Sequence, residues 1–391
     1  MKKKIIFLRY LPLTKKIQDD YCFIDLIKQG YELEYCDISD LFDYANGNVE
    51  RYETSIPLKY VRIDSYKAFT EYVRNNKDAL YWTLMTLDYK IYRIWATLCR
   101  NSCRKITFSD LAVPFGSSVE SPHWSAYLDI SKFVPRLINI YLRIRYNLNS
   151  RWFYDYLLLA GTEGWRNIGV STSKAISGAK ICSVHSRCYN DMITYKKKSE
   201  YPSDYILFVD QYLPLHPDNV MSGVEWESPE AYYEVMNSFF DSVEEAYGMP
   251  VIIAAHPKAL KYKDTNYFGG RSVIFDDIIG LIRNSRFVLI HNSTSLAYAL
   301  MLRKDVACVW AECIEKADRI FHKDIVSLSD RFCLPLLSAD APLAGQIDFT
   351  KDAAATDLYE KYHAAYLTDV REEDMHRSNG ELFTRFLSEI Y

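Results

Sequence analysis

Three groups of polar residues follow apolar runs of the chain and have side chains that could do chemistry. They are Asp210, the step His256-Pro257-Lys258, and the hydroxyl triplet Ser293-Thr294-Ser295. A carboxylate can take a proton from an acceptor hydroxyl or attack a sugar carbon directly. Histidine can bind phosphate or protonate a leaving oxygen, and lysine adds positive charge. These residue types together predict an enzyme that holds an activated, phosphate-bearing substrate.

The segment 286–302 carries the clearest of these patterns. A short apolar strand at 287–290 leads into a polar turn, and a helix is expected over 293–302. The first N–H groups of a helix and the helix dipole both favour an anion. One hydroxyl is enough to cap a helix, so capping stays open as an alternative. We expect the turn to bind phosphate through Asn292, Ser293, Thr294 and Ser295, with His291 contacting the substrate; a structural role of His291 and Asn292 is the alternative.

Three further motifs follow apolar strands. Gln211 comes directly after Asp210 and is a candidate substrate contact. Glu163 lies between Gly161 and Gly164, whose missing side chains would let a ligand approach closely, although an ordinary surface turn fits equally well. Arg187 follows another strand and could meet a carboxylate. For Asp210 itself, a turn-forming or capping aspartate is the alternative.

The elements that must position these residues alternate between strand and helix. Apolar strands are expected at 4–9, 31–36, 79–86, 105–109, 152–159 and 179–184, and again at 205–209, 250–255, 286–290 and 305–310. Helices are expected at 14–29, 88–103, 124–149, 229–247, 276–284, 293–302 and over most of 354–391. Such alternation predicts parallel sheets covered by helices, with ligands at the carboxyl ends of the strands.

The length of 391 residues predicts two domains. The charged, proline-terminated stretch 192–202 is the best boundary, so we expect domains at 1–195 and 196–350, and helices at 351–391 that pack back on the first domain. The expected fold is α/β, with two Rossmann-like domains and a cleft between them.

Composition excludes several classes of protein. A net charge of −4 argues against a general nucleic-acid binder. Nine irregularly spaced cysteines indicate reduced thiols, and no group has metal-site spacing, so we expect neither a metal nor a cofactor. Charged residues interrupt the first apolar run and no membrane-spanning run follows, which predicts a cytoplasmic protein.

One segment raises the question of a membrane surface. Residues 132–156 carry Arg136, Arg143, Arg145 and Arg151 among aliphatic and aromatic residues. Such a segment can lie near a membrane that holds a lipid-linked acceptor. The favoured interpretation is that these arginines rim a packed helix, and peripheral association with the inner face of the cell membrane is the alternative.

The order of the three polar groups resembles that of bacterial glycosyltransferases of the two-domain GT-B architecture. It is most similar to enzymes that use CMP-activated acidic sugars, namely sialyl-, polysialyl- and Kdo transferases of capsule or O-antigen synthesis. The resemblance covers mainly residues 200–310 and matches Asp210, His256-Pro257 and Ser293-Thr294-Ser295. Those sialyltransferases usually pair two acidic residues before a glycine, whereas this chain has Asp210-Gln211-Tyr212.

The resemblance implies a residue-by-residue assignment of the site. Asp210 would be the catalytic carboxylate, as a base in an inverting reaction or as a nucleophile in a retaining one. His256 and the hydroxyl triplet would hold the phosphate and cytosine ribose of CMP. Glu163 would match a glutamate that some retaining Kdo enzymes use.

We therefore expect a metal-independent glycosyltransferase that moves an acidic sugar from a CMP donor to a glycan or lipid-linked glycan in bacterial surface polysaccharide synthesis. A UDP- or GDP-hexose transferase, a nucleotide-sugar epimerase of the same fold, and a non-catalytic glycan- or nucleotide-binding partner are the alternatives.

Overall fold

The computed structural model describes most of the chain. The described residues are 3–42, 51–83, 91–112, 137–138, 140–141, 144, 154–168, 178–197, 201–202, 204–217, 219, 224–349 and 355–391. The helices expected at 124–149 lie largely outside them.

The chain forms two compact α/β units. The first contains Met1–Leu111, Val119–Asn190 and Ala364–Tyr391, and the second contains Ala112–Ser118 and Asp191–His363. The expected boundary after residue 195 lies five residues from the step between Asn190 and Asp191. Of the segment 351–391, the part from Ala364 onward belongs to the first unit.

The first unit has a seven-stranded parallel sheet in the order β3-β2-β1-β4-β5-β6-β7. Its strands are β1 (Lys4–Arg9), β2 (Glu32–Asp37), β3 (Lys59–Arg62), β4 (Leu80–Thr83), β5 (Arg104–Ser109), β6 (Tyr156–Ala160) and β7 (Lys180–Val184). Its helices include α1 (Lys15–Asp20), α2 (Phe23–Lys28), α3 (Tyr66–Asn75), α4 (Tyr92–Arg100), the start of α8 (Arg187–Thr194), and α16 (Asn379–Ile390).

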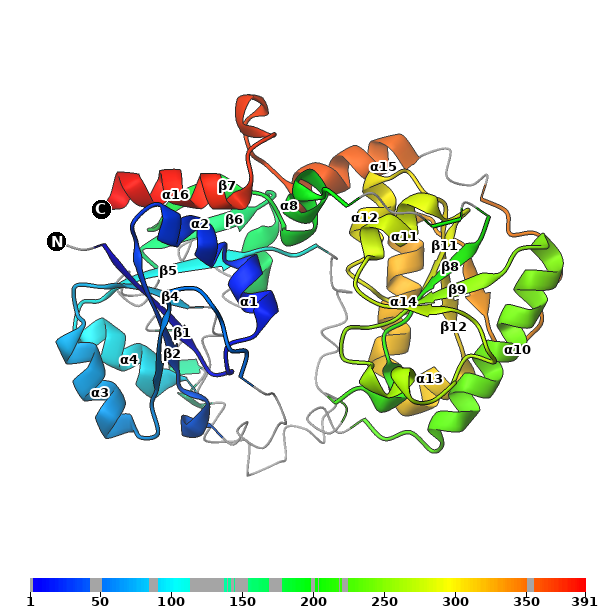
Figure 1. Ribbon diagram of the computed structural model, residues 1–391, viewed down its shortest axis with the longest axis horizontal. Helices are drawn as coiled ribbons and strands as arrows, with labels where there is room; N and C mark the ends of the chain where they lie inside the picture. Colours follow the sequence, from blue (N-terminus) through cyan, green and yellow to red (C-terminus); the bar gives the residue numbers. More distant parts are fainter. Residues whose placement is uncertain are drawn as a thin grey trace. The chain divides into compact units, whose positions relative to one another are not determined.

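Helices cover both faces of this sheet, because successive strand residues point to opposite faces. On one face Ile6 and Leu8 of β1 pack in a cluster with Trp95 of α4. On the other face Phe7 packs with Phe383 of α16. Figure 1 shows α16 and α2 on the same side of the sheet, opposite α3 and α4. Continuous apolar runs in the strands are what a sheet buried on both faces requires.

The second unit has a six-stranded parallel sheet in the order β10-β9-β8-β11-β12-β13. Its strands are β8 (Ile206–Val209), β9 (Val251–Ala254), β10 (Val273–Ile274), β11 (Val288–Ile290), β12 (Val306–Trp310) and β13 (Leu336–Ser338). Its helices include α10 (Pro229–Tyr247), α11 (Ile278–Asn284), α12 (Leu296–Met301), α13 (Glu312–Ala317), α14 (Arg319–Phe332) and α15 (Ala355–Tyr362). The expectation of two parallel-sheet α/β domains is confirmed.

Local sequence explains where the longest helix begins and ends. The Ser228 hydroxyl accepts the Ala231 N–H and caps α10, and Pro229 takes the first helical position. Gly248 ends the helix in the left-handed conformation at φ 64°, the usual role of a glycine there. The bounds of α10 match the expected helix at 229–247.

The expected helix at 14–29 is wrong in one respect. It is divided into α1 and α2, because Tyr21 leaves the helix and Cys22 adopts φ 52°, in the left-handed region. A non-glycine residue rarely adopts that conformation, so the hydrophobic pattern of 14–29 did not reveal the break. Gly30, at φ 84°, ends the helical segment as expected.

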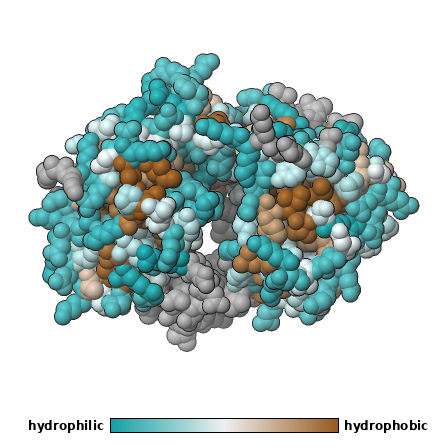
Figure 2. Space-filling model, in the orientation of Figure 1, coloured by the Kyte–Doolittle hydropathy of each residue, from teal (hydrophilic) through white to brown (hydrophobic). Residues whose placement is uncertain are grey.

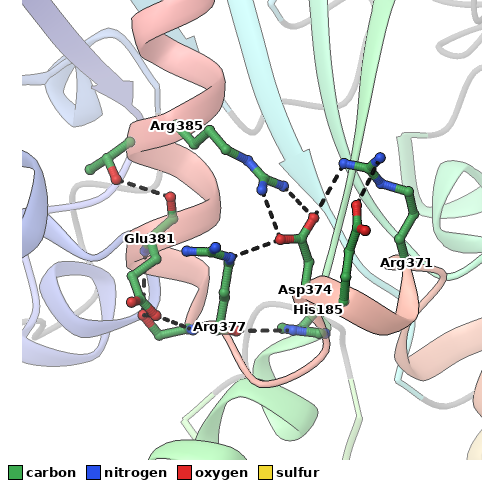
Figure 3. A network of polar contacts seen from close by, with 9 residues as sticks. His185, Arg371, Asp374, Arg377, Glu381 and Arg385 are labelled. Carbon is green, nitrogen blue, oxygen red and sulfur yellow. Dashed lines mark hydrogen bonds and ion pairs between the residues drawn. The ribbon is translucent and has the colours of Figure 1, made fainter.

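A polar network ties the C-terminal segment to the end of β7. The guanidinium groups of Arg385, Arg377 and Arg371 converge on the buried carboxylate of Asp374 (Figure 3), and their hydrogen bonds, that of Arg385 first, hold its pKa well below its usual range. The carbonyl of Arg377 contacts Nε2 of His185 at 3.0 Å. These contacts hold the loop before α16 against the sheet of the first unit.

Most of the surface visible in Figure 2 is hydrophilic, with hydrophobic residues gathered in smaller areas of each unit. Within the described part of the chain, no helix is both long enough and apolar enough to cross a membrane.

Candidate active site

The candidate site lies at the carboxyl edge of the second unit's sheet. The central strand β8 has β9 on one side and β11 on the other. The chain leaves β8 toward β9 and later returns to β11, so the strand order reverses beside β8. Ligands of open parallel sheets bind outside the carboxyl ends of the strands at such a reversal. Asp210 follows β8, His256 follows β9, and His291 follows β11.

Asp210 is buried with a 2% exposed surface. Its Oδ2 accepts the Tyr212 N–H at 3.0 Å, which closes a tight turn with Tyr212 at φ 57°. Its Oδ1 is buried and has no hydrogen-bond partner. Burial raises the pKa of Asp210 to about 6, against the opposing effect of donors such as the Tyr212 N–H. A carboxyl group with such a pKa can exchange a proton near neutral pH.

Tyrosines surround this carboxyl group. The hydroxyl of Tyr262 stabilises the charged form of Asp210, and it lies 2.9 Å from the hydroxyl of Tyr233. Burial and the nearby carboxylate raise the pKa of Tyr262 far above its usual value, so Tyr262 stays protonated. The sequence shows many tyrosines, but no spacing along the chain links Tyr233 and Tyr262 to Asp210.

Two histidines pair beside Asp210. The ring of His216 lies 5.0 Å from the ring of His256, with the two planes at 68°. Both side chains are half-buried, and Nδ1 of His256 accepts the Lys258 N–H at 3.2 Å. That bond leaves the neutral ring's proton on Nε2, where it can reach a phosphate oxygen. Each histidine precedes a proline in the sequence, and this repeated His-Pro pair is a signal that could have drawn attention to His216.

Gln211 connects the ends of β8 and β11. Its Nε2 donates to the Asn292 carbonyl, and its Oε1 accepts the Asn292 N–H at 2.9 Å. One side chain therefore satisfies both main-chain groups of Asn292. Gln211, a predicted substrate contact, is a positioning residue in this geometry.

The hydroxyl triplet differs from the expectation of several free N–H groups. The Ser295 N–H donates to Oγ of Ser293 at 3.2 Å, and the Leu296 N–H donates to the Ser293 carbonyl at 3.0 Å. The helix that follows, α12, has six residues, and the Ser295 side chain makes no capping bond. Ser293 therefore has the local turn-forming role that was the alternative. Phosphate binding by Ser293, Thr294 and Ser295 stays a prediction.

His291 has internal partners on both ring nitrogens, as the structural alternative for this residue requires. It is fully buried, Nδ1 contacts the Val309 carbonyl at 2.6 Å, and Nε2 contacts the Tyr232 hydroxyl at 2.9 Å. Nδ1 must donate to the carbonyl, so Nε2 accepts from the tyrosine. Burial lowers the pKa of His291 to about 4 and keeps the ring neutral. Both ring nitrogens are occupied by partners within the protein, and a substrate contact of His291 stays a prediction.

Glu163 and Arg187 belong to the first unit. Glu163 pairs with Arg166, and Gly161 beside it has φ 65°. A Cβ on Gly161 would lie 2.4 Å from the Ala365 carbonyl oxygen. The missing side chain of Gly161 therefore makes room for the main chain at Ala365. Arg187 forms ion pairs with Asp110 at 2.7 Å and Asp20 at 3.2 Å. The carboxylates that Arg187 contacts therefore belong to this protein, to Asp110 and Asp20.

Comparison with known proteins adds information on the fold. No model of a known protein family and no curated protein matches the sequence. Among solved structures, an asparagine-for-histidine variant of the wall teichoic acid polymerase TagF with CDPG has a TM-score of 0.54 at 11% identity, over 99% of this chain and 90% of that chain. This chain has a GT-B-type fold.

Two other similar structures have lower scores. The calicheamicin glycosyltransferase CalG4 is 10% identical, with a TM-score of 0.49 over 100% of this chain and 97% of that chain. UDP-GlcNAc 2-epimerase of Methanocaldococcus jannaschii is 11% identical, with a TM-score of 0.45 over 100% of both chains.

On this GT-B-type fold, the second unit places a buried carboxyl group with a raised pKa near a pair of histidines. His256, Pro257 and Lys258 form one turn, in which Pro257 and Lys258 are exposed. The described residues contain no group of three or more His, Cys, Asp or Glu side chains that could hold a metal ion. The positive charge and hydrogen-bond donors that could meet a phosphate here are those of Lys258, His216 and His256.

Proposed function

We propose that this protein is a glycosyltransferase that uses a nucleotide-sugar donor. The observation that supports this proposal is the buried, unpaired Oδ1 of Asp210 beside the His216–His256 pair at the strand-order reversal. Glycosyl transfer needs a group that handles the acceptor proton and groups that stabilise a departing phosphate. The GT-B-type fold supports the same reaction class without establishing it.

In the proposed reaction, an acceptor hydroxyl attacks the anomeric carbon of the donor sugar as the bond to the nucleotide phosphate breaks. Asp210 takes the hydroxyl proton as a base, or attacks the sugar first if configuration is retained. His256 and His216 hydrogen-bond the phosphate oxygens, and Lys258 adds positive charge. Gln211 fixes the turn at Asn292 that leads into Ser293, Thr294 and Ser295.

The proposed donor is a CMP-linked acidic sugar, such as Kdo or a sialic-acid-like sugar, and the proposed acceptor is a glycan of a bacterial surface polysaccharide. This choice rests on the sequence resemblance over 200–310. UDP- and GDP-hexoses are the competing donors. All of them present a phosphate to the same histidine pair, so only measured binding can separate them.

A thermal-shift screen with CMP, UDP, GDP, their sugars and CDPG tests the donor. A ligand that binds only the folded protein raises the melting temperature, by a free energy of about 2.7 kcal/mol at a hundredfold excess over its Kd. We expect a shift with CMP and a larger one with a CMP-linked acidic sugar. A shift with UDP and none with CMP would overturn the donor assignment.

Product analysis tests the reaction. Incubation with donor and acceptor should give a glycosylated acceptor and free nucleotide. Conversion of the donor sugar to its epimer without any acceptor would identify an epimerase instead. Nucleotide binding with no turnover on any glycan would favour a non-catalytic binding partner.

A further inference from the structure

An apolar stripe lies exposed on the first unit. Residues 137, 138, 140, 141 and 144 are helical, and four of them are strongly exposed: Leu137 at 49%, Ile140 at 53%, Tyr141 at 44% and Ile144 at 53%. Spacings of three, four and seven residues place these four side chains on one face of a helix. We call Leu137, Ile140, Tyr141 and Ile144 the apolar stripe.

Ile138, which directly follows Leu137, is turned toward the protein. Ile138 packs against the buried cluster that contains Ile94 and Trp95 of α4. The ring of Tyr141, at one margin of the stripe, lies 6.3 Å from the ring of Tyr92. The helix is thus attached to the first unit through one side while the stripe faces solvent. The favoured sequence interpretation, a fully packed helix rimmed by arginines, does not describe the stripe.

The grouping of these residues is unusual within this protein. The described part of the chain has eleven exposed large hydrophobic residues, and four of them lie within the eight positions 137–144. Leu260 and Ile320, at 61% and 67%, are more exposed but stand apart in the sequence. Single exposed hydrophobic residues are normal on a protein surface, whereas a contiguous group marks an interaction surface.

The charge of the surrounding sequence indicates what covers the stripe. Residues 130–154 contain five basic residues and no acidic residue, in a chain whose net charge is −4: Lys132, Arg136, Arg143, Arg145 and Arg151. Basic residues beside an apolar helix face are attracted to anionic lipid headgroups, while the apolar face enters the boundary with the acyl chains. A protein partner would need a matching acidic and apolar surface, and a second copy of this chain would bring like charges together.

We propose that the apolar stripe docks on the surface of an anionic lipid bilayer. Leu137, Ile140, Tyr141 and Ile144 enter the interface, and the positive charge of the sequence 130–154 favours a bilayer with anionic headgroups. The protein then lies on the membrane without crossing it. This proposal does not depend on the proposed glycosyl transfer, because it concerns a surface of the first unit and can be measured without substrate.

Vesicle flotation of the full chain tests the proposal. We expect binding to phosphatidylcholine vesicles that contain about one-third phosphatidylglycerol, and at least tenfold weaker partition to phosphatidylcholine alone. Salt at about 0.5 M should weaken the binding, because it screens the charges. The double variant Ile140→Ser/Ile144→Ser should lower partition to the anionic vesicles about tenfold or more.

The matched control is Leu260→Ser/Ile320→Ser, which removes two still more exposed aliphatic side chains from the second unit. It should bind vesicles like the unchanged protein. Melting temperatures of both double variants should stay near that of the unchanged protein, because the replaced side chains are exposed. No binding to anionic vesicles, or equal binding by both double variants, would overturn the proposal. Dimers that only Ile140→Ser/Ile144→Ser abolishes, without vesicle binding, would assign the stripe to self-association instead.

Discussion

The rings of His216 and His256 lie 5.0 Å apart although the two residues follow different strands, β8 and β9. That distance lets both rings contact one phosphate group. If they do so, they act as a unit and their contributions are not additive. The pair is therefore the most direct target for separating a shared phosphate site from two independent histidines.

Replacing either histidine by glutamine should lower kcat/KM about 10²-fold or more, the range for loss of one positioned hydrogen-bond donor to a developing negative charge. The double variant His216→Gln/His256→Gln should lose little more than each single variant. Steady-state kinetics with the donor found by the thermal-shift screen measures all three. Multiplicative losses would show that the two rings act on separate groups.

Replacing Asp210 by asparagine should abolish turnover while nucleotide affinity stays largely intact. Asparagine has a similar shape but cannot accept a proton or form a glycosyl bond at this position. Titration calorimetry with the nucleotide, beside product analysis, separates the two effects. Near-normal turnover would remove Asp210 from the reaction.

The same variant should be more stable than the unchanged protein at alkaline pH. Burial raises the pKa of Asp210 to about 6, above its value in an unfolded chain, so its contribution to stability is present when it is protonated and is lost as pH rises through about 6. Asparagine resembles the protonated form, and its Oδ1 can still accept the Tyr212 N–H. We expect a gain of about 3 kcal/mol at pH 8, from a pKa shift of about two units at about 1.4 kcal/mol each, and little gain at pH 4, measured by denaturant unfolding. If the Asp210→Asn variant gained no more stability at pH 8 than at pH 4, ionisation of Asp210 would have no cost in folding free energy.

Replacing Gln211 by alanine should weaken nucleotide binding and lower the free energy of unfolding by about 1–3 kcal/mol. The reason is that both main-chain groups of Asn292 lose their partner. Gln29→Ala is the matched control, because Gln29 is exposed at the end of α2 and should change stability by less than about 0.5 kcal/mol. A stable Gln211→Ala variant with unchanged nucleotide affinity would rule out the positioning role.

Replacing Gly161 by alanine should loosen the C-terminal segment. Gly30 is a matched control, since both glycines have positive φ but a Cβ on Gly30 meets nothing within 4 Å. Gly30→Ala should cost about 1–2 kcal/mol from backbone strain alone. Gly161→Ala adds a clash with the Ala365 carbonyl and should cost more, with faster proteolysis within 364–391. Equal melting temperatures for the two variants would show that the segment 364–391 can shift away from a Cβ at position 161 without loss of stability.

The central strands were predictable because their residues carry the signal themselves. The expected strand at 4–9 coincides with β1, since an unbroken apolar run can be buried on both faces of a parallel sheet. The edge strands β3 and β13 were missed. They are four and three residues long and none of their residues is buried, so their hydrophobic pattern is weak.

Side-chain roles that depend on distant partners could not be predicted. Asp210 and His256 stood out because they follow apolar strands, and the structure brings both to one sheet edge. The pairing of His216 with His256, and of His291 with Tyr232, depends on how strands and helices pack. His291 looked like a ligand contact for the same reason as Asp210, since position at a strand end does not show which way a ring points.

The division of the chain at Asn190 and Ala364 has a consequence for biosynthesis. Leu382 and Phe383 of α16 complete a face of the first unit's core, yet they are translated after the whole second unit. The second unit can therefore finish folding on the ribosome while that apolar face, begun by β1, is still uncovered. A nascent chain stalled before α16 would present this face to chaperones, and the first unit would become native only after α16 has emerged from the ribosome.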